Sequence, residues 1–379
     1  MSAPLIVLAA GGTGGHVFPA EALADVLRAR GCRLALVTDR RGRSFGGALG
    51  KSETHYVRAG GLAGKGTLAR MRSLTALAMG TLQARRLIKR LRPDVVVGFG
   101  GYPSAPTMLA ATFGGYPTII HEQNAVLGRA NRLLASRVTR IATSFDRAQG
   151  LGAAAPGKVV HTGMPVRPAI VEMREIPYVP PTDDAPINLF VLGGSQGAKI
   201  LSTVVPDAVA RVHGALRARL RIVQQCRPED IDAVRAQYAR LGVPAELASF
   251  FDDVPQRMAA AHLVISRAGA SSIAEIAAVG RPSILAPYPH AVDDHQSENA
   301  HAVDDAGAGW LIPDRALTPE TLAERFESLF SLPAILTTAA QCAREFGHVD
   351  AAERLADVVF SLIEETVRTV PSGVERSLS

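Results

Sequence analysis

The sequence predicts an α/β fold with two doubly wound parallel-sheet domains that face each other across a cleft. Three observations predict it. A short apolar run that ends in clustered glycines and leads into a helix-like stretch occurs twice, near residue 4 and again near residue 187. The chain has 379 residues, which suggests two domains of ordinary size. Short apolar runs alternate with amphipathic stretches in both halves, as in parallel sheets covered by helices on both faces.

The first half begins with a strand, a glycine loop and a helix. Residues 4–10 are apolar and lead into a loop that contains Gly11, Gly12, Gly14 and Gly15, after which residues 20–30 show helical periodicity. Further apolar runs of strand length lie at residues 33–38, 94–98 and 117–121. Because helical stretches separate these runs, we expect one open parallel sheet.

The second half repeats this order. Prolines and polar residues interrupt the periodicity at residues 172–186, which we interpret as an exposed connector near the domain junction. After it come a strand at 187–192, a glycine loop at 193–198, a helix from about 200, strands at 220–225, 263–266 and 283–287, and an amphipathic helix at 349–368. We expect two Rossmann-like domains, residues 1–166 and 167–346, with a final helix at about 347–368. In such sheets ligands bind beyond the carboxyl ends of the strands, so a two-substrate enzyme is expected.

Composition excludes several classes of protein. Hydrophobic residues make up 47% and charged residues 20% of the chain, which is far from the composition of a disordered protein. The three cysteines, Cys32, Cys226 and Cys342, are widely spaced and form no C-x-x-C pair, so neither a disulfide framework nor a zinc site is indicated. No apolar run approaches the roughly 20 residues of a membrane helix. The first residues predict a strand and not a signal peptide.

Charge is distributed unevenly between the halves. Residues 1–166 carry 22 Lys and Arg against 7 Asp and Glu, a net charge of +15, whereas the remaining residues carry 19 against 28, a net charge of −9. The basic segment from Lys65 to Arg92 surrounds the apolar stretch 74–82. Such a segment can lie on an anionic membrane surface, although a solvated basic helix is the alternative. Aromatic residues for base stacking are almost absent from the basic segments, so we expect no nucleic-acid partner.

The first glycine loop, residues 11–16, predicts a phosphate site. Its backbone N–H groups precede a helix, where the helix dipole also favours negative charge. The dinucleotide-binding fingerprint is incomplete because Val17 occupies its third glycine position. A tight turn without a ligand is the alternative. His16 at this loop can accept a proton near neutral pH, which makes it a candidate base.

Three further segments carry candidate binding residues. Ser195 adds a hydroxyl donor to the second glycine loop, and Arg167 near the domain junction can pair with a diphosphate. Glu275 ends the small-residue segment 266–275 and can accept hydrogen bonds from ribose hydroxyls. The alternative for Arg167 is a surface arginine without a ligand, and the alternative for Glu275 is a solvated glutamate on a helix. The acidic and histidine-rich run 290–299 lacks metal-ligand spacing, so we expect no metal.

Polar residues also follow two strands of the first half. Tyr102 lies in the run Gly100-Gly101-Tyr102-Pro103-Ser104, and Glu122 lies in the run His121-Glu122-Gln123-Asn124. Both runs open at the same edge of the sheet as His16, where they suggest contacts to sugar hydroxyls. The alternative for Glu122 is an acid that stabilises a helix N-terminus.

Taken in order, these motifs closely resemble those of the MurG family of N-acetylglucosaminyltransferases, from about residue 4 to residue 365. The resemblance rests on the loop from Gly11 to Ala20, on the runs at 98–102 and 121–124, on the second glycine loop and on the segment 266–275. It implies a two-domain glycosyltransferase B fold whose last helix crosses back onto the N-terminal domain. It also implies inverting, metal-independent transfer without a cofactor. The donor is UDP-N-acetylglucosamine, and the acceptor is the muramoyl 4-hydroxyl of lipid I, which becomes lipid II in peptidoglycan synthesis.

The same resemblance implies roles for single residues and a location. The chain would act as a peripheral protein at the cytoplasmic face of the bacterial inner membrane, with the N-terminal domain binding the acceptor and the C-terminal domain binding the donor. His16 is the expected base, with Glu122 as the alternative. The residues expected around the donor are Thr13, Gly14, Gly15, Asn124 and Arg167 at the edge of the site, Ser195 at the diphosphate, the backbone near Phe251 at the uracil, Ala270, Ser271, Ser272, Ile273, Ala274 and Glu275 at the diphosphate and ribose, and Gln296 at the sugar.

Two other functions remain open from the sequence. A UDP-N-acetylglucosamine 2-epimerase shares the fold and the donor but needs neither a lipid acceptor nor a basic apolar face. A non-catalytic protein that binds a nucleotide sugar or a nucleic acid is the second alternative, against which His16 and the two glycine loops argue.

Overall fold

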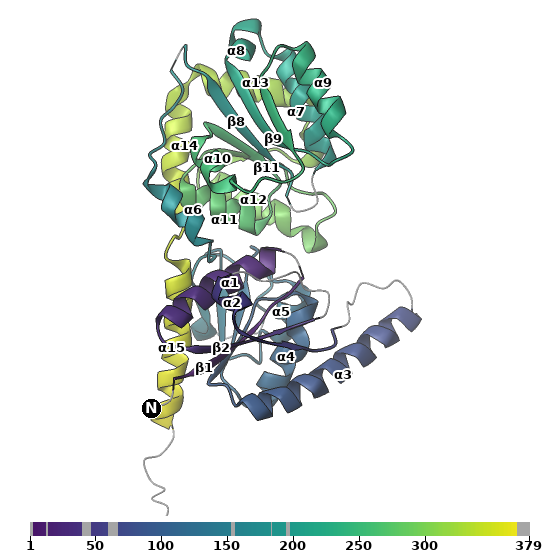
Figure 1. Cartoon of the computed structure of the whole chain (residues 1–379), viewed down its shortest axis with the longest axis vertical. Helices are drawn as coiled ribbons and strands as arrows, with labels where there is room; N and C mark the ends of the chain where they lie inside the picture. The colour runs from purple at the N-terminus through teal and green to yellow at the C-terminus, as the bar shows by residue number, and fades with distance from the viewer. Residues whose placement is uncertain are drawn as a thin grey trace, which may run out of the picture. The chain divides into compact units, whose positions relative to one another are not determined.

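The computed structural model describes residues 3–12, 14–39, 47–59, 67–152, 156–182, 184–194 and 198–369 (Figure 1). The chain divides into two compact units. The first unit contains residues Met1–Gln123, Leu127–Pro165 and Asp350–Ser379, and the second contains Asn124–Val126 and Val166–Val349. The irregular stretch 172–186 therefore lies inside the second unit, whose continuous part begins at residue 166.

A seven-stranded parallel sheet forms the centre of the first unit. Its strands are β1 (Leu5–Ala9), β2 (Arg33–Thr38), β3 (Glu53–Tyr56), β4 (Val95–Gly98), β5 (Thr118–Glu122), β6 (Arg140–Thr143) and β7 (Val159–His161). The strand order is β3-β2-β1-β4-β5-β6-β7. The order reverses between β1 and β4, so the loops after these two strands flank the point where such sheets bind ligands.

Helices cover both faces of this sheet. They are α1 (Gly14–Ala29), α2 (Gly47–Gly50), α3 (Thr67–Leu91), α4 (Gly101–Phe113), α5 (Arg129–Leu134) and α15 (Ala351–Thr369), with a short 3-10 helix at Pro156–Lys158. Along β1 the side chains alternate, so Ile6 and Leu8 pack with α1 and α15, whereas Val7 packs with α3 and α4. Two ion pairs, Arg30–Asp357 and Arg140–Glu365, also hold α15 to this unit.

A six-stranded parallel sheet forms the centre of the second unit. Its strands are β8 (Ile187–Leu192), β9 (Leu220–Gln225), β10 (Ala245–Ala248), β11 (Leu263–Ser266), β12 (Ser283–Leu285) and β13 (Gly309–Leu311). The order is β10-β9-β8-β11-β12-β13, which reverses between β8 and β11. The prediction of two doubly wound parallel sheets is confirmed.

The helices of the second unit lie on both faces of its sheet. They are α6 (Pro168–Glu172), α7 (Lys199–Arg211), α8 (Gly214–Arg219), α9 (Ile231–Arg240), α10 (Val254–Ala260), α11 (Ala270–Val279), α12 (His295–Asp305), α13 (Pro319–Ser331) and α14 (Pro333–Phe346), with 3-10 turns at Met173–Glu175, Val292–Asp294 and Asp314–Ala316. Helices α7, α9 and α13 cover one face, while α10 and α11 cover the other. Across the described residues, no helix combines the length and apolar character that crossing a membrane requires.

The first helix differs from the prediction. We expected helical structure from residue 20, but α1 already begins at Gly14. Glycines and Pro19 occupy its first turns, and both residue types lower helix propensity. The early start brings His16 into the first turn of α1, directly after the glycine loop.

Candidate active site

The glycine loop after β1 has little room for side chains. A Cβ atom at Gly11 would lie 2.6 Å from the Thr38 hydroxyl oxygen and 3.0 Å from Cβ of Pro103. Gly12 adopts a φ of +93°, a backbone conformation that favours glycine. The glycines therefore let the loop pass close to Thr38 and Pro103 before the chain enters α1. The first N–H groups of α1, at Gly14 and Gly15, have no partner within the helix ladder and are suited to an anion. Thr13 lies outside the described residues.

His16 lies against the loop after β4. A Cβ atom at Gly101 would come within 3.2 Å of Cδ2 and 3.3 Å of Nε2 of the His16 ring, so a side chain at this position would displace the imidazole. Gly100 and Gly101 also have φ angles of +77° and +70°. The other side of the ring is held by Gln123, whose Oε1 lies 3.1 Å from His16 Nδ1. Tyr102 follows Gly101 in the first turn of α4 and is half-buried.

His121 is fully buried beside this network. Its Nε2 lies 3.2 Å from the carbonyl oxygen of Gly163, and its Nδ1 lies 3.1 Å from Nε2 of Gln123. Burial, which disfavours the charged imidazolium, lowers the pKa of His121 to about 4, and nearby His16 adds to this effect. The carbonyl of Gly163 opposes it. His121 is therefore neutral at physiological pH.

Glu122 turns into the first unit and is only 1% exposed. Its Oε2 accepts hydrogen bonds from the backbone N–H of Gly128 at 2.9 Å and from Nδ2 of Asn131 at 2.8 Å. Asn131 also donates to the carbonyl oxygen of His121 at 3.2 Å. Sequence reasoning missed Asn131, because an asparagine in an ordinary helix gives no signal of a contact to a strand residue.

Asn124 belongs to the second unit, where Asn299 of α12 holds it. The Asn299 side chain is fully buried and donates to Oδ1 of Asn124 at 3.1 Å and to the carbonyl oxygen of Ala268 at 3.1 Å. It also accepts from the backbone N–H of Ala125 at 2.8 Å. Asn124 is thereby linked to the loop before α11. Sequence reasoning missed this role of Asn299, because in the run 290–299 it weighed a metal site and assigned only Gln296 to the donor. Among the residues with described positions, no group of three His, Cys, Asp or Glu side chains could hold a metal ion.

Helix α11 starts where the small-residue segment predicted a ligand. It begins at Ala270, directly after β11 and Gly269, so Ser271, Ser272, Ile273 and Ala274 form its first turns. Small side chains at a helix N-terminus allow an anion to approach the backbone N–H groups. Glu275 follows, and this residue is only 9% exposed.

Arg167 and Glu275 form a bidentate ion pair. Arg167 Nε lies 2.8 Å from Oε1 of Glu275, and its Nη2 lies 3.0 Å from Oε2. Burial raises the pKa of Glu275, and the positive charge of Arg167 opposes that rise. In this structure Arg167 therefore contacts the carboxylate that was expected to bind ribose. Each carboxylate oxygen keeps further acceptor capacity for a hydroxyl group.

The remaining predicted donor residues lie at the ends of other elements. Phe251 follows β10 and is buried, with its ring 6.2 Å from that of Phe190 and the guanidinium of Arg257 4.4 Å above it. Gln296 lies in the first turn of α12, and its Oε1 accepts from the backbone N–H of Tyr288 at 2.9 Å. Ser195 lies outside the described residues.

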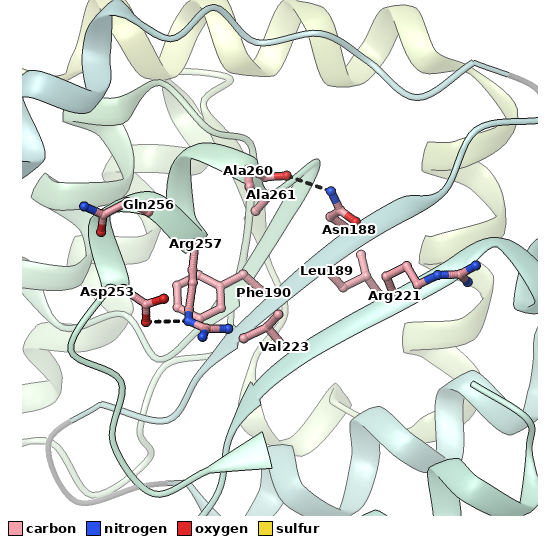
Figure 2. Close-up of a pocket in the computed structure, with 10 residues that line it drawn as sticks. All are labelled: Asn188, Leu189, Phe190, Arg221, Val223, Asp253, Gln256, Arg257, Ala260 and Ala261. Atoms are coloured by element: carbon pink, nitrogen blue, oxygen red, sulfur yellow. Dashed lines mark hydrogen bonds and ion pairs between the residues drawn. The ribbon is translucent and has the colours of Figure 1, made fainter. Parts of the chain in front are cut away.

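A separate pocket of about 370 Å³ lies on one face of the second sheet, beside α10 (Figure 2). Figure 2 shows Arg257 donating to Asp253 and Asn188 donating to the carbonyl oxygen of Ala260. Glu246 also pairs with Arg257. None of the predicted site residues lines this pocket, so it adds nothing to the site at the strand ends.

Helix α3 presents a second candidate surface. It packs alongside α4 in Figure 1. A Cβ atom at Gly80 would clash with the carbonyl oxygen of Arg58, so glycine at this position lets α3 lie close to the segment after β3. Its outer side carries exposed apolar residues, namely Met71, Leu74, Met79 and Leu82, which are 63%, 57%, 47% and 51% exposed. The exposed basic residues are Arg72, Arg85, Arg86, Lys89 and Arg90. Together these nine residues form the α3 surface. Lys65 lies outside the described residues, and Arg70 outside the described side chains.

Known proteins share this organisation over nearly the whole chain. Residues 6–143 match the glycosyltransferase family 28 N-terminal domain, and residues 188–355 match the glycosyltransferase family 28 C-terminal domain. The UDP-N-acetylglucosamine--N-acetylmuramyl-(pentapeptide) pyrophosphoryl-undecaprenol N-acetylglucosamine transferase of Paramagnetospirillum magneticum is 59% identical, over 95% of this chain and 97% of its own length. The protein of the same name from Rhodospirillum rubrum is 56% identical, over 98% of this chain and 95% of its own.

Solved structures agree with these relatives. The crystal structure of Acinetobacter baumannii MurG has a TM-score of 0.77 and 29% identity, covering 94% of this chain and 99% of that one. A putative UDP-N-acetylglucosamine 2-epimerase from Listeria monocytogenes has a TM-score of 0.65 at 15% identity, covering 96% and 98%, which shows likeness of fold alone. The predicted glycosyltransferase is therefore confirmed and favoured over the epimerase. The chain belongs to glycosyltransferase family 28.

Proposed function

We propose that this chain transfers N-acetylglucosamine from UDP-N-acetylglucosamine to undecaprenyl-pyrophosphoryl-N-acetylmuramyl-pentapeptide, which converts lipid I to lipid II in peptidoglycan synthesis. The observation that carries the proposal is the 59% identity to a transferase with this name over nearly the full length of both chains. The geometry at the strand ends supports it, because a half-buried histidine and two helix N-termini supply a base and sites for phosphate.

The reaction we propose is a single inverting displacement. The acceptor 4-hydroxyl oxygen attacks the anomeric carbon of the sugar while the bond between that carbon and the diphosphate oxygen breaks. His16 takes the hydroxyl proton, and UDP leaves with the electron pair of the broken bond. Backbone N–H groups at the start of α11 stabilise the negative charge of the departing diphosphate without needing a metal or a cofactor.

The surroundings of the two candidate bases favour His16. Its ring lies against the glycines of the loop after β4, and His16 itself belongs to the first turn of α1. Glu122 instead uses its carboxylate to hold Gly128 and Asn131 within the first unit. We therefore assign proton transfer to His16 and assign to Glu122 the positioning of the segment that follows β5.

For the donor, we propose the residues that the sequence indicated. Gly14 and Gly15, with Thr13, close over the nucleotide sugar, and Tyr102 contacts sugar hydroxyls. Ser195 and the residues from Ala270 to Ala274 bind the diphosphate, and Glu275 accepts from the ribose hydroxyls while Arg167 holds its carboxylate in place. The backbone near Phe251 binds the uracil. The side-chain oxygen of Gln296 accepts from the backbone N–H of Tyr288, which leaves its amide N–H groups to donate to the sugar. Asn124 is also proposed to lie at the sugar.

We further propose that the α3 surface binds the anionic inner leaflet of the cytoplasmic membrane, where a lipid-linked acceptor resides. Exposed apolar side chains next to clustered basic residues match the chemistry of such a leaflet. The domain of residues 1–166 with the final helix would then receive the acceptor, and the domain of residues 167–346 would bind the donor.

The function can be tested with donor labelled in the sugar, incubated with purified protein in the presence and absence of membranes that contain lipid I. We expect label in the lipid fraction and release of UDP only when lipid I is present. An altered free sugar formed from the donor alone would instead support the epimerase, and donor binding without any product would support a non-catalytic protein.

A further inference from the structure

A chain of hydrogen bonds links the proposed base to the interior of the first unit. Oε1 of Gln123 lies 3.1 Å from Nδ1 of His16. Nε2 of the same amide lies 2.9 Å from the carbonyl oxygen of Phe99, 3.1 Å from the carbonyl oxygen of His121 and 3.1 Å from His121 Nδ1. Gln123 is 3% exposed and His121 is fully buried. Water is therefore excluded from most of the network.

The two carbonyl oxygens determine the orientation of the Gln123 amide. Carbonyl oxygens only accept hydrogen bonds, so the end of the amide that faces Phe99 and His121 is the NH₂ group. The amide oxygen therefore faces His16. Because that oxygen also only accepts, Nδ1 of His16 must carry the ring proton, and the lone pair of the neutral imidazole resides on Nε2.

His121 supports the same orientation. Its Nδ1 accepts from Gln123 and its Nε2 donates to the carbonyl oxygen of Gly163, which is the arrangement of a neutral imidazole. Burial lowers the pKa of His121 to about 4, in agreement with that neutral form. A proton on Nδ1 of His121 would meet the NH₂ group of Gln123 and would oppose the observed amide orientation.

We propose that Gln123, oriented by the Phe99 carbonyl and by His121, is a positioning residue that keeps His16 in the tautomer protonated at Nδ1, so that Nε2 receives the acceptor proton. The catalytic part of this inference rests on the proposed function. The tautomer itself follows from the hydrogen bonds and holds whatever the acceptor is.

The tautomer can be measured by NMR on protein labelled with ¹⁵N-histidine, because protonated and unprotonated ring nitrogens have well-separated shifts. A His16→Gln variant assigns the His16 signals. In the parent protein we expect His16 to be protonated at Nδ1. In Gln123→Met, which has similar length but no acceptor, we expect the proton to move wholly or partly to Nε2. In Gln123→Glu, burial against the carbonyl oxygens of Phe99 and His121 favours a protonated carboxyl, whose hydroxyl donates to them. Its carbonyl oxygen still accepts from His16 Nδ1, so the parent tautomer should be retained.

Steady-state kinetics on the same proteins complete the test. We expect Gln123→Met to lower kcat by about 10- to 100-fold, the scale of a misplaced base, with the donor KM changed by less than about threefold. Gln123→Glu should recover a large part of that loss. A parent protein with His16 protonated at Nε2, or a Met variant that keeps the Nδ1 proton, would overturn the inference. Absence of transfer by the parent protein, with the expected tautomer, would reject the proposed function and leave the tautomer assignment standing.

Discussion

At the scale of single residues, the chemistry of the site depends on what the neighbouring side chains accept and donate. His16 follows β1 and Glu122 ends β5, two strands of one sheet that β4 separates. The His16 ring lies against the glycines after β4, whereas the Glu122 carboxylate accepts hydrogen bonds from Gly128 and Asn131. Both residues could be selected from the sequence as candidate bases. The difference between them arises from Gln123, whose partner His16 is distant in the chain, and from Asn131, whose contacts with β5 follow no helix or strand periodicity.

His16→Ala tests the proposed base. We expect kcat to fall by about 100-fold or more, because proton transfer from the acceptor hydroxyl loses its recipient. UDP affinity, measured by calorimetry, should stay nearly unchanged, since binding of the nucleotide is assigned to other residues. Turnover equal to that of the parent protein would remove His16 from this role.

Stability should depend on pH through His121. Its pKa is about 4 in the folded protein and about 6.5 when unfolded, so the unfolded chain binds the extra proton first as the pH falls. Stability contributed by the neutral form is therefore complete above about pH 6.5 and is lost between pH 6.5 and 4, by about 3 kcal/mol in total. The free energy of unfolding, measured with urea at a series of pH values, should depend less steeply on pH for His121→Gln than for the parent protein. Parallel curves for the two proteins would contradict the assignment.

At the scale of elements, the sequence predicted the strands at the centre of each sheet and missed β3, β6, β7, β10 and β13. Strands β1, β2, β8 and β9 are continuous apolar or alternating runs and lie where they were expected. Strands β3 and β10 were missed because each has four residues that are mostly exposed or half-buried, so tertiary pairing and not local pattern makes them strands. The contacts of the site, such as that of Asn299 with Asn124, could not be predicted either, because they also depend on tertiary packing and not on a local sequence pattern.

The α3 surface yields a prediction about membranes. Replacing Arg86, Lys89 and Arg90 with Ser should weaken binding to anionic vesicles by about 10- to 100-fold at low salt, since each basic residue near the surface contributes on the order of 1 kcal/mol. A matched control replaces three exposed arginines of the second unit, Arg211, Arg235 and Arg240. The control should bind vesicles as strongly as the parent protein. Both variants should keep the UDP affinity of the parent protein. Equal vesicle binding by all three proteins would reject this role of α3.

Arg281 ties the irregular stretch after α6 to the second unit. It is 1% exposed and donates to the carbonyl oxygens of Ala259, Val279, Gly280 and Ile176. Burial lowers its pKa to about 10, so it remains charged at neutral pH. This residue explains why a stretch without helical or strand periodicity is still ordered against the core.

Arg281→Met should therefore destabilise the second unit by about 3 kcal/mol or more, because buried carbonyl groups lose their donor. Arg281→Lys should recover only part of this loss, since one ammonium group cannot span all four carbonyls. Fluorescence of Trp310, the single tryptophan of the chain, reports on this unit during urea unfolding. An unchanged urea midpoint in both variants would show that these hydrogen bonds contribute little.

At the scale of the whole molecule, the order of the motifs carried more information than any one of them. Each glycine loop alone fits a plain turn, and Arg167 alone fits a surface position. The order of these motifs along the 379 residues indicated the family, and the matched family domains and the relatives confirm it. The uneven charge, +15 in residues 1–166 and −9 in the rest, agrees with the proposal that the first half faces the anionic membrane.

The most direct test of the proposed reaction is the structure of its product. The lipid formed from UDP-N-acetylglucosamine and lipid I by purified protein would be isolated, its mass measured, and the new glycosidic bond characterised by NMR. The account predicts the addition of one N-acetylglucosamine through a β bond to the muramoyl 4-hydroxyl, because a single displacement inverts the α configuration of the donor. An unmodified lipid, an α bond or attachment at another hydroxyl would contradict it.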